Sequence, residues 1–219
     1  MPVGECVKTS MKEYWNSRYE DEGRVWGESP SKTAERAREV FQQHDVRTIL
    51  LPGSGYGRNS KLFSCSKFEV TGVDVSDIAC GLADEHDPAT VFFEASVLDM
   101  SFLAGVFDAV YCFNVLHLFR EADRKRFLEQ CAEKLKSSGL MFYSVFSEEE
   151  PSFGTGGEIE PYTFESKPGR PVHYFTDSDL RDHFDDHEVL ESGVMEDPED
   201  HGEGPHTHVL RYILARKTA

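Results

Sequence analysis

The chain has 219 residues, of which 39% are hydrophobic, and a formal net charge of −17. This length supports one substantial core but not two full domains. No apolar run approaches the roughly 20 residues that cross a membrane, and the N-terminus lacks the apolar stretch of a signal peptide. We therefore expect a cytoplasmic monomer or homodimer without a membrane partner. The negative charge disfavours nucleic acid and leaves a small molecule or a basic protein as the partner.

Cysteine and histidine spacing does not indicate a metal centre. The five cysteines are scattered and form no CxxC pair, so we expect reduced thiols at Cys6, Cys65, Cys80, Cys112 and Cys131. Three histidines lie between His201 and His208, and on a strand His206 and His208 would face the same side. Because no third ligand follows at a regular spacing, we predict no metal there, and either a loop–strand junction that lines the site or a pair of surface histidines.

The first half of the chain alternates between helices and short apolar strands. The pattern predicts a helix with Ala34, Ala37, Val40 and Phe41 on one face, a strand over Thr48–Leu51, a short helix through Lys61–Phe63, a strand over Glu69–Val73, and a helix that starts at Asp77 with Ser76 as its cap. Near-continuous apolar strands between helices are typical of a parallel sheet that is covered on both faces.

The second half continues this alternation and then departs from it. We expect strands over Thr90–Phe93, Phe107–Phe113 and Leu140–Phe146, with a helix from Glu121 to Ser138 that stops at Gly139. Two strands without a helix between them follow, over Glu188–Met195 and His206–Arg216, and should pair antiparallel. The sequence thus predicts an α/β fold: a seven-stranded, mostly parallel sheet with helices on both faces and an antiparallel C-terminal strand.

A long insertion rich in Gly, Pro and acids lies between the strand that ends at Phe146 and the C-terminal strand pair. A structureless loop of this length is uncommon in a compact domain, and the aromatic residues Phe153, Tyr162 and Phe164 favour a packed lid. We predict one domain over 1–219, in which 1–30 covers a bound cofactor, 31–146 is the core, 147–175 is a lid-like insertion, and 176–219 adds a helix and a strand pair.

The clearest motif is ILLPGSGYGRNS, where a strand runs through Gly53, Gly55 and Gly57 into a helix. Glycines let the backbone turn sharply and approach a ligand. A dinucleotide fingerprint would need a third glycine at position 58, which is Arg58, so a pyrophosphate ligand is disfavoured. Asp74 ends the next strand about 20 residues later, the position from which an acid binds ribose hydroxyls. The alternative interpretation of Asp74 is an acid at a helix start.

The segment from Ile49 to Phe146 resembles the core of the class I S-adenosylmethionine-dependent methyltransferases, which have a Rossmann-like fold. The matches are the glycine loop, GVDVS, EASVLDMSF, FDAVYCFNVLHLF and LKSSGLMFY. Leu51 departs from the acid that is common before the loop, and Asp99 replaces Ser96 in the adenine segment if the register shifts. The resemblance implies that S-adenosylmethionine is bound by Trp15, Tyr19, Trp26, Gly53, Ser54, Gly55, Gly57, Arg58, Asn59, Asp74, Val75, Ser96, Val97, Phe113 and Asn114.

The N-terminal segment YWNSRYEDEGRVWGESPS is similar to that of thiopurine and thiol/halide methyltransferases, and GRNS is similar to tellurite-resistance methyltransferases. In the first branch such aromatics cover the cofactor, whereas ordinary core packing is the alternative for Trp15, Tyr19 and Trp26. The resemblance implies in-line methyl transfer to a small molecule. From their positions, the candidate residues on the acceptor side are His117, just past the fourth strand, and His173 with Tyr174 at the end of the lid. A protein lysine methyltransferase and a non-catalytic, cofactor-binding regulator are the alternatives.

Overall fold

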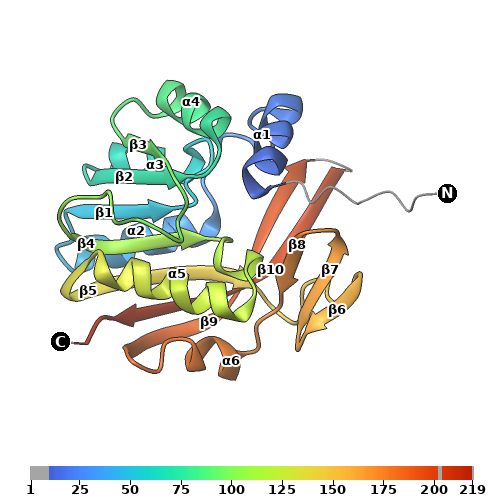
Figure 1. Cartoon of the computed structure of the whole chain (residues 1–219). Coiled ribbons are helices and arrows are strands. Elements are labelled where there is room, and N and C mark those ends of the chain that lie inside the picture. Colours follow the sequence, from blue (N-terminus) through green and yellow to red (C-terminus); the bar gives the residue numbers. More distant parts are fainter. Residues whose placement is uncertain (1–9, 202–203, 219) are drawn as a thin grey trace.

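The computed structural model describes residues 10–201 and 204–218, without the side chain of His201. Its centre is a seven-stranded sheet in the order β3-β2-β1-β4-β5-β10-β9 (Figure 1). The strands are β1 (Thr48–Pro52), β2 (Glu69–Asp74), β3 (Val91–Glu94), β4 (Phe107–Phe113), β5 (Leu135–Phe146), β9 (Glu188–His201) and β10 (Gly204–Arg216). The first five are parallel, and β10 runs antiparallel to both β5 and β9. The predicted fold class is confirmed.

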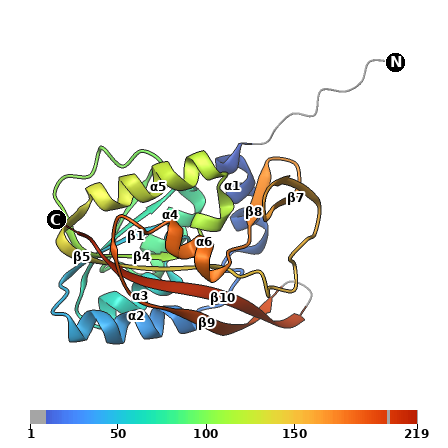
Figure 2. The same cartoon turned by 90° about the horizontal axis from the view of Figure 1, so that it is seen from below.

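Helices cover both faces of this sheet (Figure 2). On one face, α2 (Lys32–Gln43) and α3 (Arg58–Cys65) bury Phe41 and Phe63 against β1, β4 and β5. On the other, α5 (Glu121–Glu133) and α6 (Asp177–Asp182) bury Phe127 and Leu180 against the same strands. Among the described residues, no helix combines the length and the apolarity needed to span a membrane.

Side-chain caps set where several helices begin. The Ser76 hydroxyl accepts the N–H of Ala79 at 3.0 Å, as predicted for the start of α4 (Asp77–His86). An element without a predicted counterpart, α1 (Met11–Glu22), begins with a capping box of Ser10 and Glu13. The Asn16 side chain of α1 binds both Ser76 and Asp77 across the gap to α4. These bonds hold α1 over the start of α4, at the edge of the sheet.

The predicted end of the fifth helix is wrong. The helix α5 stops at Glu133 with Lys134 as its cap, and β5 begins at Leu135, so Gly139 lies inside the strand. Lys134 accepts the N–H of Phe107 at 2.7 Å, and Leu135 pairs with Phe107 at the start of β4. The pairing of β5 with β4 therefore ends the helix early, although the sequence contains no helix-breaking residue before position 138.

Residues 147–175 form a small three-stranded antiparallel sheet with the order β6-β7-β8 (Figure 1). Its strands are β6 (Gly157–Glu160), β7 (Thr163–Lys167) and β8 (Arg170–His173). The predicted aromatic packing exists, because Phe153 contacts Tyr162, Phe164 and Tyr174 with ring centroids 5.3 to 6.0 Å apart. The insertion is thus folded around an aromatic cluster of its own.

Asp108 joins the start of β1 to β4. Its Oδ2 atom accepts the N–H groups of Arg47 and Thr48 and the hydroxyl of Thr48, and its Oδ1 atom lies 2.6 Å from Lys136 Nζ. Partial burial raises the pKa of Asp108, but the hydrogen bonds from Lys136, Thr48 and Arg47 outweigh burial and lower the pKa to about 2. The carboxylate form is therefore the one that stabilises the fold.

We predict that Asp108→Asn lowers the free energy of unfolding at pH 7 by about 1–2 kcal/mol, the scale of charged hydrogen bonds at a partly exposed site. The pKa of Asp108 is depressed on folding, so its contribution is present above the unfolded value of 3.8 and is lost as pH falls toward about 2. Urea titrations should show the difference from wild type shrinking over that window. Exposed Asp84→Asn is the matched control, and a pH-independent difference would contradict the assignment.

Candidate functional site

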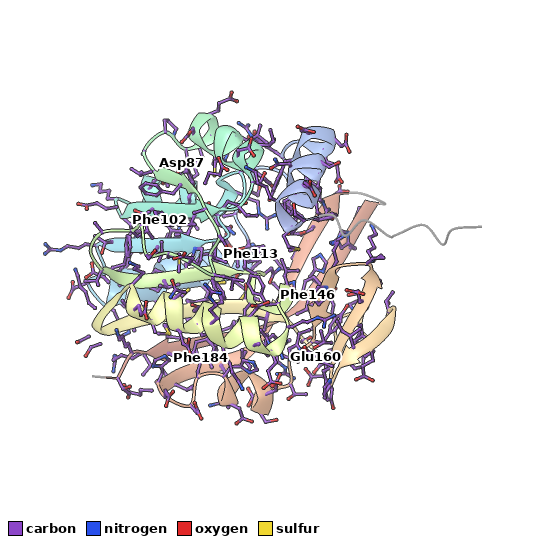
Figure 3. The ribbon with its side chains drawn as sticks, in the orientation of Figure 1. Asp87, Phe102, Phe113, Phe146, Glu160 and Phe184 are labelled. Carbon is purple, nitrogen blue, oxygen red and sulfur yellow. The ribbon has the colours of Figure 1, made fainter. Side chains whose placement is uncertain are left out.

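A cavity of about 420 Å³ lies at the carboxyl ends of the parallel strands. Figure 3 labels Phe113 and Phe146 where β4 and β5 end, on the side that faces α1 and the small sheet. The cavity wall contains most of the predicted site residues: Trp15, Tyr19, Trp26, Gly53, Ser54, Gly55, Arg58, Asn59, Asp74, Val75, Ser96, Val97, Phe113, Asn114 and His117. Segments from the whole length of the chain therefore meet at this edge of the sheet.

The glycine loop forms one end of the cavity. The N–H groups of Gly53 and Ser54 both donate to Val73 O, which ties the loop to the end of β2. A Cβ atom at Gly53 would lie 2.2 Å from the Val115 side chain, and one at Gly55 would lie 3.0 Å from the Tyr19 hydroxyl. Gly57 differs from the prediction, because it is not in the cavity wall and instead lies against α4.

Asp74 lies beside the loop with 8% of its surface exposed. Its two oxygens accept the N–H groups of Gly55 and Ser76, each at 2.9 Å. Burial raises the pKa of the Asp74 carboxyl, although the N–H groups of Ser76, Gly55 and Val75 act in the opposite direction. Each carboxylate oxygen has a further lone pair, so a ligand that donates hydroxyl groups would relieve the cost of this burial.

Aromatic side chains from the N-terminal segment cover this end of the cavity. Trp15 and Tyr19 stack with ring centroids 5.9 Å apart, and Trp26 stacks on Tyr56 at 6.0 Å. The Tyr56 hydroxyl donates to Gly27 O and accepts the N–H of Trp26. Both tryptophans of the chain thus lie in the cavity wall, so their fluorescence should report on anything that fills it.

The side of the cavity near the end of β3 bears on the two predicted alignments of the adenine segment, one with Ser96 and one with Asp99 at the site. Ser96 and Val97 line the cavity. Asp99 is exposed and outside the wall, and its carboxylate accepts the N–H of Ser101. Of the two candidate residues, Ser96 therefore lines the cavity and Asp99 does not.

The opposite end of the cavity is built from β4, η1 (Leu116–Leu118), β5 and β10. His117 is buried and stacks on Phe146 at 4.3 Å, and His208 stacks on Phe146 at 5.0 Å. Burial lowers the pKa of His117 to about 3, with the nearby His208 and His173 acting in the same direction. The His117 imidazole is therefore neutral at physiological pH.

Three residues of this wall have a buried polar atom without a hydrogen-bond partner among the described residues. The atoms are Ser54 Oγ at the loop end, His117 Nδ1 at the other end, and Arg18 Nε, which lies 3.5 Å from Glu22 in an ion pair. Buried polar groups are nearly always paired in folded proteins. Because these atoms are buried, a bound molecule could pair with them only if the side chains that cover them move.

The structure does not bring His173 and Tyr174 to the cavity, which corrects their predicted place in it. His173 Nδ1 contacts the Thr163 hydroxyl and Nε2 contacts Asp179, each within 2.8 Å. The Tyr174 hydroxyl donates to Ser152. Both residues are buried. His173 thus joins the insertion to α6, whereas the Tyr174 hydroxyl bonds within the insertion and its ring lies 6.1 Å from the Phe146 ring of β5.

Sequence reasoning missed several residues of the wall. Glu199 reaches the wall from β9, and Arg170 and Val172 reach it from β8. His208 reaches it from β10, which is one of the two placements considered for the histidine pair. Glu199 Oε1 lies 2.9 Å from Arg58 Nη2. No spacing rule connects residues this far apart in the chain, although the cluster of histidines after Glu199 was visible.

Comparison with known proteins identifies the central segment. Residues 50–143 match a methyltransferase domain family. A probable S-adenosylmethionine-dependent methyltransferase of Mycobacterium tuberculosis is 28% identical over 118 residues, which are 53% of this chain and 42% of that protein. The chain thus aligns with less than half the length of that relative.

Solved structures share the fold over almost the whole chain. Magnesium protoporphyrin IX methyltransferase from Synechocystis, solved with bound S-adenosylhomocysteine, has a TM-score of 0.72 at 16% identity and covers 94% of this chain and 97% of its own. The 1,6-didemethyltoxoflavin-N1-methyltransferase of Burkholderia thailandensis has a TM-score of 0.69 at 22% identity and covers 95% and 87%. Residues 50–143 therefore match a methyltransferase domain, and the chain shares the fold of these two methyltransferase structures.

Proposed function

We propose that the protein transfers a methyl group from S-adenosylmethionine to a small molecule held in the same cavity. The observation that carries the proposal is that the glycine loop with Asp74 and the wall with His117 enclose one continuous space. A cavity of about 420 Å³ that must also take the cofactor leaves room for a small acceptor. The net charge of −17 adds support, because it disfavours a nucleic acid acceptor.

The residues at the loop end fit this cofactor. Asp74 would bind the ribose hydroxyls, Ser54 and Asn114 would face the amino acid part, and Ser96 and Val97 would border the adenine. The absence of a side chain at Gly55 leaves the loop edge open. When bound, S-adenosylmethionine supplies a methyl group on a positively charged sulfur. The sulfur compound that remains after transfer is neutral and leaves without being protonated.

The chain itself would then align the acceptor and exclude water. Trp15, Tyr19 and Trp26 cover the loop end. In this proposal residues 147–175 act as a lid, because Arg170 and Val172 of β8 line the cavity. The Arg170 guanidinium also lies 3.8 Å from the centre of the Tyr14 ring in α1. The lid and the N-terminal cover thus meet across the opening.

We predict that S-adenosylhomocysteine changes the tryptophan fluorescence, because Trp15 and Trp26 both line the cavity. Asp74→Ala should weaken its binding about 10- to 100-fold, the scale of hydrogen bonds to a charged group. Asp99→Ala is the matched control, since Asp99 is exposed and outside the cavity. Unchanged affinity in Asp74→Ala would remove that residue from the site.

The acceptor class can be tested with methyl-labelled cofactor. We expect the label to enter the low-mass fraction of a cell extract and not the protein fraction retained by the same filter. The transfer should disappear with Asp74→Ala. Label confined to the proteins would favour the protein methyltransferase instead, and label in neither fraction would favour a regulator without catalysis.

We predict that His117 binds the acceptor through a hydrogen bond and does not act as a general base. His117→Phe keeps a ring against Phe146 but removes both ring nitrogens, so the acceptor KM should rise about 5- to 100-fold. The affinity for S-adenosylhomocysteine should stay unchanged. Because the pKa of His117 is about 3, its protonation does not change near neutral pH. A rate-controlling pKa near 6.5 that vanishes in the variant would contradict this role.

A further inference from the structure

Glu199, His206 and His208 form a cluster at the cavity wall. One carboxylate oxygen and two imidazole nitrogens lie within 4.8 Å of one another. Glu199 of β9 is paired directly with His206 of β10, and His208 is two residues further along β10. Residues that are opposite each other or two apart share one face of a sheet. The strand register therefore directs all three side chains to the same side.

The outer nitrogen of each imidazole is held by an acceptor. His206 Nδ1 lies 2.9 Å from Gly204 O, and His208 Nδ1 lies 2.7 Å from Glu150 Oε1. A carbonyl and a carboxylate only accept, so each Nδ1 carries the proton, and in the neutral ring Nε2 presents a lone pair. Metal-binding histidines are oriented in the same manner, by a carbonyl or a carboxylate on the nitrogen away from the metal.

The two Nε2 atoms lie close together. His206 Nε2 and His208 Nε2 are 3.3 Å apart, within hydrogen-bond distance. Because both Nδ1 atoms donate, this hydrogen bond requires one of the rings to carry a second proton. A metal ion between the two nitrogens would take the place of that proton. Two nitrogens at about 2.0–2.1 Å from one zinc ion, at a tetrahedral angle, are about 3.3 Å apart.

The carboxylate of Glu199 is oriented for the third position. Its Oε1 atom accepts from Arg58 at 2.9 Å, and its Oε2 atom lies 3.7 Å from His208 Nε2. The Glu199 side chain is only 5% exposed. Arg58 thus fixes one oxygen and leaves the other on the side of the imidazoles.

We propose that Glu199, His206 and His208 bind a zinc ion at the wall of the cavity. Two imidazoles and one carboxylate suit zinc better than magnesium or calcium, which prefer oxygen ligands. Three protein ligands leave a fourth position open, as in catalytic zinc sites. Glu199 and His208 line the cavity, so the open position would face it. The spacing of His206 and His208 indicated no third ligand in the sequence, and Glu199 of β9 supplies one in the folded chain.

A role for this ion follows only if the proposed methyl transfer is correct. A hydroxyl or thiol of the acceptor could then occupy the open position, where zinc lowers its pKa and helps it lose a proton. Zinc binding itself requires neither the cofactor nor the acceptor. The two proposals can therefore fail separately.

The test is a zinc titration of the metal-free, full-length protein by calorimetry, followed by Co²⁺ substitution. We expect stoichiometric binding of one ion per chain at micromolar protein, and the intense visible bands of tetrahedral Co²⁺. His206→Gln and His208→Gln should each weaken zinc binding by more than about 100-fold, and Glu150→Gln by about 10- to 100-fold. His44→Gln is the matched control, because His44 is exposed and far in sequence from the cluster.

Far-UV circular dichroism and thermal unfolding show whether each variant is folded, independently of the cofactor. His206 is exposed, so His206→Gln should keep its fold. The proposal is wrong if the wild-type protein binds no zinc. It is also wrong if His206→Gln and His208→Gln retain wild-type zinc affinity or if the Co²⁺ protein lacks tetrahedral bands.

Discussion

Arg58 is the residue that joins the separate parts of the cavity wall. Its guanidinium donates to Trp26 O, pairs with Glu199 at 2.9 Å and lies over the Phe113 ring. Both charged side chains are less than one tenth exposed. Loss of one partner of such a pair leaves an uncompensated buried charge, at a cost of about 3–5 kcal/mol. The N-terminal cover, β4 and the C-terminal hairpin are thereby held in one arrangement.

This arrangement gives the two ends of the cavity different chemistry. Backbone N–H groups and the Asp74 carboxylate lie at the glycine loop, whereas stacked rings of His117, Phe146 and His208 lie at the other end. A polar, hydroxyl-rich ligand suits the first end, and a flatter, partly apolar molecule suits the second. The cation proposed at Glu199 would lie on the wall that Arg58 stabilises, so the same ion pair supports both functions.

Much of the fold could be predicted because its signals are local. Buried parallel strands are apolar along their whole length, and Ser76 stands directly before the helix that it caps. The end of α5 could not be predicted, because the pairing of Leu135 with Phe107 competes with a helix that has no sequence break. The capping box of Ser10 and Glu13 was a readable signal for α1.

The sequence by itself determined that the glycine loop and Asp74 lie side by side. They follow consecutive strands, and the ends of such strands must meet in a parallel sheet. It also placed His206 and His208 on one face of a strand. Only the tertiary structure brought Glu199 to Arg58, 141 residues away, and Glu150 to His208, 58 residues away. It likewise moved His173 and Tyr174 out of the cavity. Contacts between distant segments depend on how the layers pack, and no local spacing of residues encodes that packing.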